Sequence, residues 1–176
     1  MNLLPRPLLI QGSFIIRPVL VWFMKGDRFV DPIDGQGYYS LLPYGYEKQR
    51  DNVLSPGTFS LERHRLMWLY LKNETTFFSR KAKVLHIAPE QSFIKRFRAM
   101  PNLEYITSDL ESPLADVKAD ICDLPFGDDT FDLVFCNHVL EHIPDDHKAM
   151  SELFRVMKPG GWGILQVPMK NSLEKT

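Results

Sequence analysis

The stretch that most constrains the fold is residues 117–168, in which two apolar segments enclose a polar loop and an amphipathic segment. Residues 131–136 are almost wholly apolar, as in a strand that is covered on both faces of a parallel sheet. Residues 145–157 open with acidic side chains and continue with apolar ones at helical spacing, and residues 162–167 are apolar again. Residues 117–168 thus predict strand, loop, strand, loop, helix and strand in an open α/β sheet, whose ligands bind outside the carboxyl ends of the strands.

A similar pattern precedes this stretch. Residues 83–88 predict a strand, residues 92–100 a helix with one apolar face, and residues 104–108 a second strand. Asp109 ends that second strand, about 20 residues beyond Ala88. An acidic residue at this distance is placed to hydrogen-bond a ribose diol. The alternative is that Asp109 only caps the turn that follows it.

Capping residues predict where two helices begin or end. Pro159 cannot extend the helix over residues 145–157, and Gly160 accepts the left-handed conformation that closes a helix. Ser60 is the predicted cap of an earlier, largely apolar helix. Near its start, residues 63–65 (Arg-His-Arg) form either an anion site or a solvated face.

The composition fits one ordinary domain with a proper core: 176 residues, 44% hydrophobic and 24% charged, with a formal net charge of -1. A near-neutral charge gives no support for nucleic-acid binding. The two cysteines, Cys122 and Cys136, imply no disulfide framework, so a cytoplasmic location is expected. Prolines and arginines interrupt the apolar residues 3–24, so neither a stable membrane anchor nor a signal peptide is expected.

The chain is expected to divide into an N-terminal extension with a small turn-rich module, residues 1–59, and a core domain, residues 60–176. Residues 25–59 are rich in Gly, Pro, Tyr and Asp, which predict turns with short strands between them. They contain no cysteine, so no zinc ribbon is expected. Residues 1–23 are either an extended arm or sequence ahead of a natural start at Met24.

Four pieces of the chain carry a family resemblance by their order and spacing. They are residues 120–126 (DICDLPF), 131–134 (FDLV), 139–145 (VLEHIPD) and 152–161 (ELFRVMKPGG). Together they resemble the core of class I S-adenosylmethionine (SAM)-dependent methyltransferases, in particular the type 11 group that includes quinone-biosynthesis enzymes. The resemblance implies an α/β, doubly wound, Rossmann-like and mostly parallel sheet with strand order 3-2-1-4-5. The family's C-terminal strands 6 and 7 have no counterpart in this sequence.

The resemblance also implies SAM as cofactor and assigns residues near the first strand to it. His86 stands at the family's usual acidic position, Ala88 is small enough for close approach, and Glu90 can pair with the cofactor's ammonium group. The family's glycines are absent here, which is a departure from its pattern. For His86 the alternative is a buried histidine at the end of the strand.

Later residues are assigned to the rest of the cofactor. By the resemblance, Asp109 takes the ribose hydroxyls, Asp120 faces the adenine amine and Ile121 covers the ring. Asn137 begins the loop that passes beneath the sulfonium. Cys122, which neighbours Asp120 and Ile121, is assigned to packing.

Methyl transfer needs a base only if the acceptor is protonated in its reactive state. His138 is the leading candidate because histidine titrates near neutrality, with Glu141 and His142 as further candidates. The alternative is that these residues only build a turn. No metal site is expected, because the i, i+4 spacing of His138 and His142 makes a ligand pair only on a helix and this stretch reads as a loop.

The sequence therefore predicts a SAM-dependent methyltransferase with a small or medium-sized acceptor. A second hypothesis is a truncated, non-catalytic relative that serves as a binding module, favoured by the missing glycines and missing C-terminal strands. The expected partner is a small-molecule acceptor; the chain is either a fragment or a shortened protein that needs another subunit or a second copy. A nicotinamide-dependent oxidoreductase is disfavoured because no Gly-x-Gly-x-x-Gly follows the first strand.

Overall fold

The computed structural model describes residues 16–45 and 48–168, which group into two compact units, Met1–Thr76 and Phe77–Thr176. Each unit is described by itself. The domain boundary predicted after residue 59 stays a prediction. The interpretation of residues 1–23 as an arm lies mostly outside the described residues, of which 16–24 are helical.

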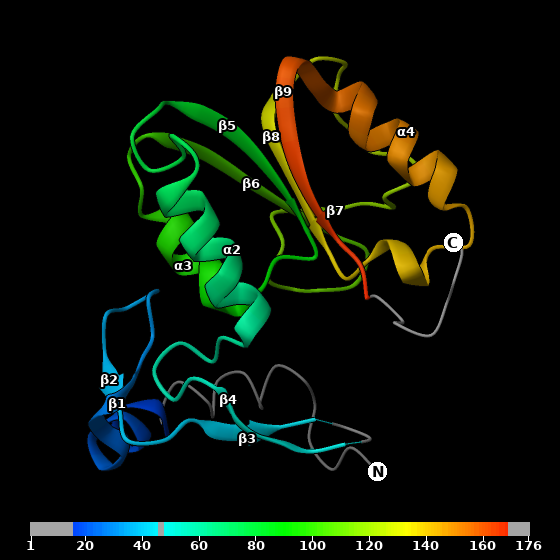
Figure 1. Ribbon diagram of the computed structural model, residues 1–176. Coiled ribbons are helices and arrows are strands. Elements are labelled where there is room, and N and C mark those ends of the chain that lie inside the picture. Colours follow the sequence, from blue (N-terminus) through cyan, green and yellow to red (C-terminus); the bar gives the residue numbers. More distant parts are fainter. Residues whose placement is uncertain (1–15, 46–47, 169–176) are drawn as a thin grey trace. The chain divides into compact units, whose positions relative to one another are not determined.

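The second unit contains a five-stranded sheet (Figure 1). Its strands are β5 (Ala82–Ile87), β6 (Leu103–Asp109), β7 (Val117–Lys118), β8 (Phe131–Asn137) and β9 (Met157–Gln166). They are all parallel and lie in the order β7-β6-β5-β8-β9. In chain order this is 3-2-1-4-5, so the predicted topology is confirmed. The strand order reverses at β5, with β6 on one side of it and β8 on the other, and such a switch point places a ligand crevice at the carboxyl ends of the strands.

Two helices cover opposite sides of this sheet, α3 (Gln91–Arg98) and α4 (Asp146–Val156) (Figure 1). The face that α3 buries includes Phe93 and Phe97, which are fully buried. At the start of α4, Asp145 Oδ1 accepts a hydrogen bond from the backbone N–H of Lys148 at 2.9 Å, so the acidic opening of the pattern is a cap. The buried side of α4 is made by its residues 149, 153 and 156, which leaves Phe154 76% exposed.

The end of α4 differs from the prediction. The helix stops at Val156, and Met157 is already extended, so no glycine closes the helix. Gly160 does have a positive φ of 78°, but it lies inside β9, where the pairing with β8 shifts register. The left-handed glycine therefore forms a bulge in the strand, because the chain enters the sheet directly after the helix.

The first unit contains two small antiparallel ribbons and a helix. Its elements are β1 (Lys25–Val30), β2 (Gly37–Tyr38), β3 (Leu42–Tyr44), β4 (Arg50–Leu54) and α2 (Glu62–Asn73). The buried carboxylate of Asp31 holds the turns together: its Oδ2 accepts hydrogen bonds from the hydroxyls of Thr58 at 2.5 Å and Ser60 at 3.2 Å. The hydrogen bonds to this buried carboxylate therefore join separate turns of the first unit.

The predicted cap of α2 was wrong. Ser60 donates to Asp31, and Leu61 occupies the capping position, where its backbone N–H donates to His64 Nδ1 at 3.1 Å. Arg65 Nη1 donates to the carbonyl oxygens of Ser60 at 2.8 Å and Val53 at 3.0 Å. Arg65 thus binds the unit's own backbone, which is neither of the two roles predicted for residues 63–65.

A charge pair fastens the segment between β7 and β8 to α4. Glu152 Oε2 accepts from the backbone N–H of Leu124 at 2.9 Å and from Arg155 Nη2 at 2.7 Å. Arg155 also donates to the carbonyl oxygens of Leu124 and Phe126. These hydrogen bonds tie the loop that follows Asp120 to the helix.

An acid-dependent loss of stability is expected from this pair. Hydrogen bonding by Arg155 holds the pKa of Glu152 at about 2, below its ordinary 4.5. A lowered pKa in the folded state contributes stability that is complete above pH 4.5 and is lost as pH falls through about 2. We expect Glu152→Gln to lower the urea midpoint at pH 7 and to change it little near pH 2. A difference that stays constant between pH 7 and pH 2 would contradict this assignment.

Candidate functional site

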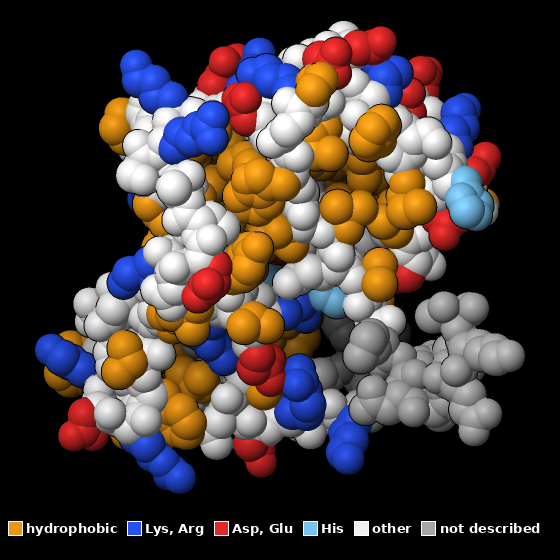
Figure 2. All heavy atoms as spheres, turned by 45° about the horizontal axis from the view of Figure 1, so that its top comes forward, with side chains coloured by type: hydrophobic (Ala, Val, Ile, Leu, Met, Phe, Trp, Pro, Cys, Tyr) orange, Lys and Arg blue, Asp and Glu red, His pale blue; other side chains and the backbone are white. Residues whose placement is uncertain are grey.

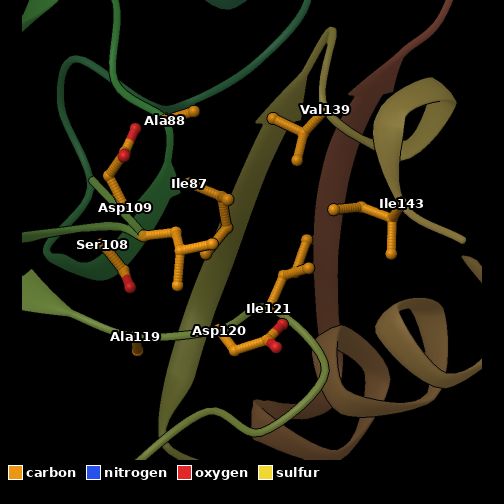
Figure 3. A pocket seen from close by; sticks show the side chains of 10 residues that line it. Ile87, Ala88, Ser108, Asp109, Ala119, Asp120, Ile121, Val139 and Ile143 are labelled. Atoms are coloured by element: carbon orange, nitrogen blue, oxygen red, sulfur yellow. The ribbon is translucent and has the colours of Figure 1, made fainter. Parts of the chain in front are cut away.

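A pocket opens at the carboxyl ends of the strands (Figure 3). Its lining comes from the end of β5, the end of β6, the segment after β7 and the segment after β8, and consists of Ile87, Ala88, Ser108, Asp109, Leu110, Ala119, Asp120, Ile121, Val139 and Ile143. The volume comparable with that of a cavity is about 130 Å³. This is smaller than the roughly 300–1,000 Å³ usual for small-molecule sites, because the pocket is partly open to solvent.

Four of the predicted cofactor residues meet in this pocket: Ala88, Asp109, Asp120 and Ile121. Figure 3 shows the two carboxylates on separate parts of the wall, with apolar side chains between them. They meet because β6 and β7 are neighbouring parallel strands, whose carboxyl ends lie at one edge of the sheet. An apolar pocket with a few polar groups on its wall is the usual form of a ligand site.

Asp109 has one oxygen occupied and one available. Its Oδ1 accepts hydrogen bonds from the backbone N–H groups of Glu111 at 2.8 Å and Ser112 at 2.7 Å. The turn role that was the alternative for Asp109 is therefore real. It is compatible with ligand binding, because the same turn fixes the carboxylate on the pocket wall with Oδ2 still able to accept.

Asp120 is fixed in a comparable way. Its Oδ1 accepts from the backbone N–H of Cys122 at 2.8 Å, and its carbonyl oxygen accepts from Asp123 N at 3.0 Å. Next to it Ile121 is only 6% exposed and belongs to the core on the α4 side of the sheet. A carboxylate beside an apolar wall suits a planar ring that carries an amino group.

Ala88 has a left-handed backbone, with a φ of 48°. Its N–H donates to the carbonyl oxygen of Ser108 at 2.8 Å, so the chain stays joined to β6 as it turns away from β5. This is the position of a sharp turn at which glycine is the usual residue. Alanine adopts it at a cost of about 1 kcal/mol, and it has the smallest side chain that a chiral residue can bring to the pocket wall.

Substitutions at Ala88 are expected to test whether its left-handed backbone is strained. Ala88→Val should lower the free energy of unfolding by about 2 kcal/mol, because a β-branched residue tolerates a positive φ poorly. Ala88→Gly should change it by less than about 1 kcal/mol, because relief of strain is offset by greater freedom in the unfolded chain. Urea denaturation measures both. Equal stability of the valine and alanine forms would mean that residue 88 is not left-handed in solution.

Three predicted cofactor residues lie beside the pocket and form a chain of contacts. His86 is fully buried; its Nδ1 lies 2.7 Å from the hydroxyl of Tyr105 and its Nε2 lies 2.7 Å from Glu90 Oε2. Asn137 Nδ2 donates to Glu90 Oε1 at 3.1 Å. The buried strand-end histidine that was the alternative for His86 is what the structure shows. Its ring has no surface open to a ligand, whereas the side chain of Glu90 is 15% exposed.

The predicted base His138 follows β8 directly. It has a φ of 56°, and its N–H donates to the carbonyl oxygen of Gln166 at 2.7 Å. Its Nδ1 lies 3.3 Å from Glu141 Oε1, and the imidazole is partly exposed. Glu141 and His142 belong to a single 3₁₀ turn, Leu140–His142, so the expected loop contains one helical turn. A non-glycine residue in the left-handed region at the end of a strand is a feature that clusters at functional sites.

Within residues 16–45 and 48–168 no group of three or more His, Cys, Asp or Glu side chains is arranged to hold a metal ion. Cys136 is fully buried, and desolvation raises the pKa of its thiol to about 12. A thiol that stays protonated is a packing group and not a ligand. The helices in the same described ranges are too short or too polar to cross a membrane.

Several wall and support residues were missed from the sequence. Val139 and Ile143 carry no individual role in the resemblance, although apolar residues among the polar ones of residues 137–144 are a signal that an apolar wall is needed there. Tyr105 was taken only as part of a strand. It pairs in register with Val84 and shares a sheet face with His86, which only strand pairing reveals.

Comparison with known proteins agrees with this geometry. The Methyltransferase domain family model, of type 11, matches residues 71–165, more than half of the chain. Demethylmenaquinone methyltransferase of Clavibacter sepedonicus is 49% identical over 45 residues, which are 26% of this chain and 18% of that protein. Sterol 4-C-methyltransferase strm-1 of Caenorhabditis elegans is 33% identical over 84 residues, which are 48% of this chain and 23% of that protein.

One solved structure that resembles the chain is Haemonchus contortus phosphoethanolamine N-methyltransferase 2 in complex with phosphomonomethylethanolamine and S-adenosylhomocysteine. Its TM-score is 0.43 at 21% identity, over 51% of this chain and 26% of that one. The matched segments span about a quarter or less of the length of the curated relatives. With the family model matched over most of the described sheet, the chain belongs to the class I SAM-dependent methyltransferases.

Proposed function

We propose that the chain binds SAM in the pocket at the strand ends and transfers its methyl group to a small or medium-sized acceptor. The observation that carries the proposal is that Asp109 and Asp120 line one apolar pocket from neighbouring strands. A ribose diol offers two hydroxyl donors, and an adenine amine offers N–H donors on the opposite edge of the nucleoside. Two separate carboxylates therefore match the donors of one adenosine.

The side chains at the pocket also have the chemical properties that SAM requires. Ile121, Val139 and Ile143 provide apolar contact for a planar ring. Ala88 lets the backbone approach closely, and Glu90 adds a negative charge beyond it. SAM, when bound, supplies a methyl group on a positively charged sulfur, which makes that carbon electrophilic. The tasks that remain for the protein are to hold, align and keep water away from the reacting groups.

The proposed role of His138 is to accept a proton from the acceptor where the reactive form must lose one. The contact between its Nδ1 and Glu141 supports this role, because a carboxylate at one ring nitrogen orients the other toward the crevice. Asn137, the preceding residue, binds Glu90 and so ties the end of β8 to the end of β5. For the methyl acceptor, the proposal extends only to its size, which is small or medium.

For the location of the protein we propose the cytoplasm, supported by the absence of a disulfide between Cys122 and Cys136, which are both free thiols. A partner subunit or a second copy of the chain is proposed as a further partner beside the small-molecule acceptor.

The direct test is titration of the purified chain with S-adenosylhomocysteine in a calorimeter, followed by transfer of labelled methyl from SAM into a cell extract. Saturable one-to-one binding with label in a small molecule is the expected result. Binding without any transfer would favour the second hypothesis, a non-catalytic binding module. Absence of binding would overturn the cofactor assignment.

A further inference from the structure

A line of polar side chains runs from the middle of β6 to the edge of the crevice, on the α3 side of the sheet. In order they are Tyr105, His86, Glu90 and Asn137, joined by contacts of 2.7, 2.7 and 3.1 Å. Aromatic rings surround its inner end: the ring centroid of His86 lies 6.4 Å from Phe93, and that of Tyr105 lies 5.5 Å from Phe97. A polar line buried among rings is stable only if its members satisfy one another.

The direction of the hydrogen bond between Tyr105 and His86 follows from the protonation of the Tyr105 hydroxyl. Burial, and to a smaller extent the nearby charge of Glu90, raises the pKa of Tyr105, so its hydroxyl keeps its proton and donates to His86 Nδ1. A neutral imidazole that accepts at Nδ1 carries its proton on Nε2. His86 Nε2 lies 2.7 Å from Glu90 Oε2, a short contact between the two side chains whose angle is not that of a hydrogen bond. Glu90 is thus contacted on both oxygens: Oε1 accepts a hydrogen bond from Asn137 Nδ2, and Oε2 lies against His86 Nε2.

The backbone explains why Glu90 is within reach of His86. Ala88 is left-handed and Pro89 follows it, so the chain turns back on itself directly after β5. Glu90 is the residue that precedes α3, and its side chain returns to the strand end. Ala88 lines the pocket, and Glu90, whose side chain is 15% exposed, follows it two residues later in the chain.

We propose that Tyr105 and His86 form a buried positioning relay that holds the Glu90 carboxylate for the ammonium group at the amino-acid end of the cofactor. The inference rests on the proposed function and extends it: His86 acts through Glu90 and does not touch the cofactor. Asn137 holds the second oxygen of the same carboxylate from β8. The relay gives this chain a fixed negative charge at the strand end without a glycine loop.

Two adenosine ligands isolate this contact. S-adenosylhomocysteine carries the amino-acid end, whereas 5′-methylthioadenosine has the same adenosine and sulfur without it. Loss of a held charge partner should weaken the first by roughly 10-fold or more in Glu90→Gln, and by roughly 3- to 10-fold in Tyr105→Phe and His86→Leu. The affinity for 5′-methylthioadenosine should stay within about 2-fold in all three, since adenosine contacts are unchanged.

His86→Gln is the conservative variant, because its amide retains a donor for Glu90. It should keep more of the preference for S-adenosylhomocysteine than His86→Leu does. Phe97→Leu is the packing control: it alters the same ring cluster and should leave the ratio of the two affinities unchanged. Tyr105→Phe keeps the ring and thus the fold, and thermal denaturation without ligand checks each variant.

The outcomes are distinct. A fall in S-adenosylhomocysteine affinity alone supports the relay. Equal loss of both ligands, or no loss of either, in folded Glu90, His86 and Tyr105 variants overturns it while the pocket assignment stands. Failure of the unmodified chain to bind either ligand overturns the proposed function, and the relay with it.

Discussion

Replacing Asp109 and Asp120 together by asparagine is expected to weaken S-adenosylhomocysteine binding at least about 100-fold, because each charged hydrogen bond contributes about 1.5–3 kcal/mol. Asparagine keeps a carbonyl oxygen for the turn amides at residues 111, 112 and 122. The second carboxylate oxygen becomes an amide donor. At position 120 that donor would face the donors of the adenine amine, so the loss is one of recognition and not of folding.

Asp123→Asn is the matched control. Asp123 is exposed in the same loop, and its backbone N–H, not its side chain, binds Asp120. The Asp123→Asn variant should bind S-adenosylhomocysteine with the same affinity as the unmodified chain in the same calorimetric titration. If the double variant bound S-adenosylhomocysteine as tightly as the control, the adenosine would have to bind elsewhere, and the pocket would lose its assignment.

His138→Asn is expected to slow methyl transfer to a protonated acceptor by about 100-fold or more, the usual contribution of a general base, and to leave S-adenosylhomocysteine affinity unchanged. Asparagine is the appropriate replacement because it tolerates the positive φ of 56° at this position. The ascending limb of the pH–rate profile should disappear in the variant. Transfer of labelled methyl into the extract, followed from pH 5 to pH 9, measures both effects.

A control for histidine loss is His147→Asn on the exposed side of α4, where only the backbone carbonyl of His147 is engaged, by Ser151. It should transfer methyl at the unmodified rate. A rate for His138→Asn that matches this control at every pH would remove His138 from the chemistry and leave it as a turn residue paired with Glu141.

Exposed side chains show where helical spacing misleads. Met150 and Phe154 fit the apolar pattern of α4 yet are 44% and 76% exposed, and small Ala149 is fully buried in their place. Periodicity identifies a helix reliably, but which side of it meets the sheet depends on how closely the helix approaches the sheet. In the view of Figure 2, apolar side chains accordingly remain at the surface of the chain.

The sequence by itself determined the strands and helices of the sheet and the position of Asp109 at the end of the second strand. These follow from local signals: apolar runs of strand length, turn residues between them, and the distance of an acidic residue from the first strand. The strand order and the place of Asp120 were expected from the family resemblance, and the two carboxylates line one pocket because neighbouring parallel strands end at one edge.

Only the tertiary structure decided what His86, Gly160 and Ser60 do. Local signals predict a helix cap for Ser60 and for Gly160, and the resemblance places His86 at the cofactor. In the folded chain Ser60 binds Asp31, Gly160 lies where β9 shifts its register with β8, and His86 contacts Tyr105. The physical reason is that a buried polar group or a left-handed residue takes whichever partner satisfies it in the folded chain, and sequence distance does not limit that choice.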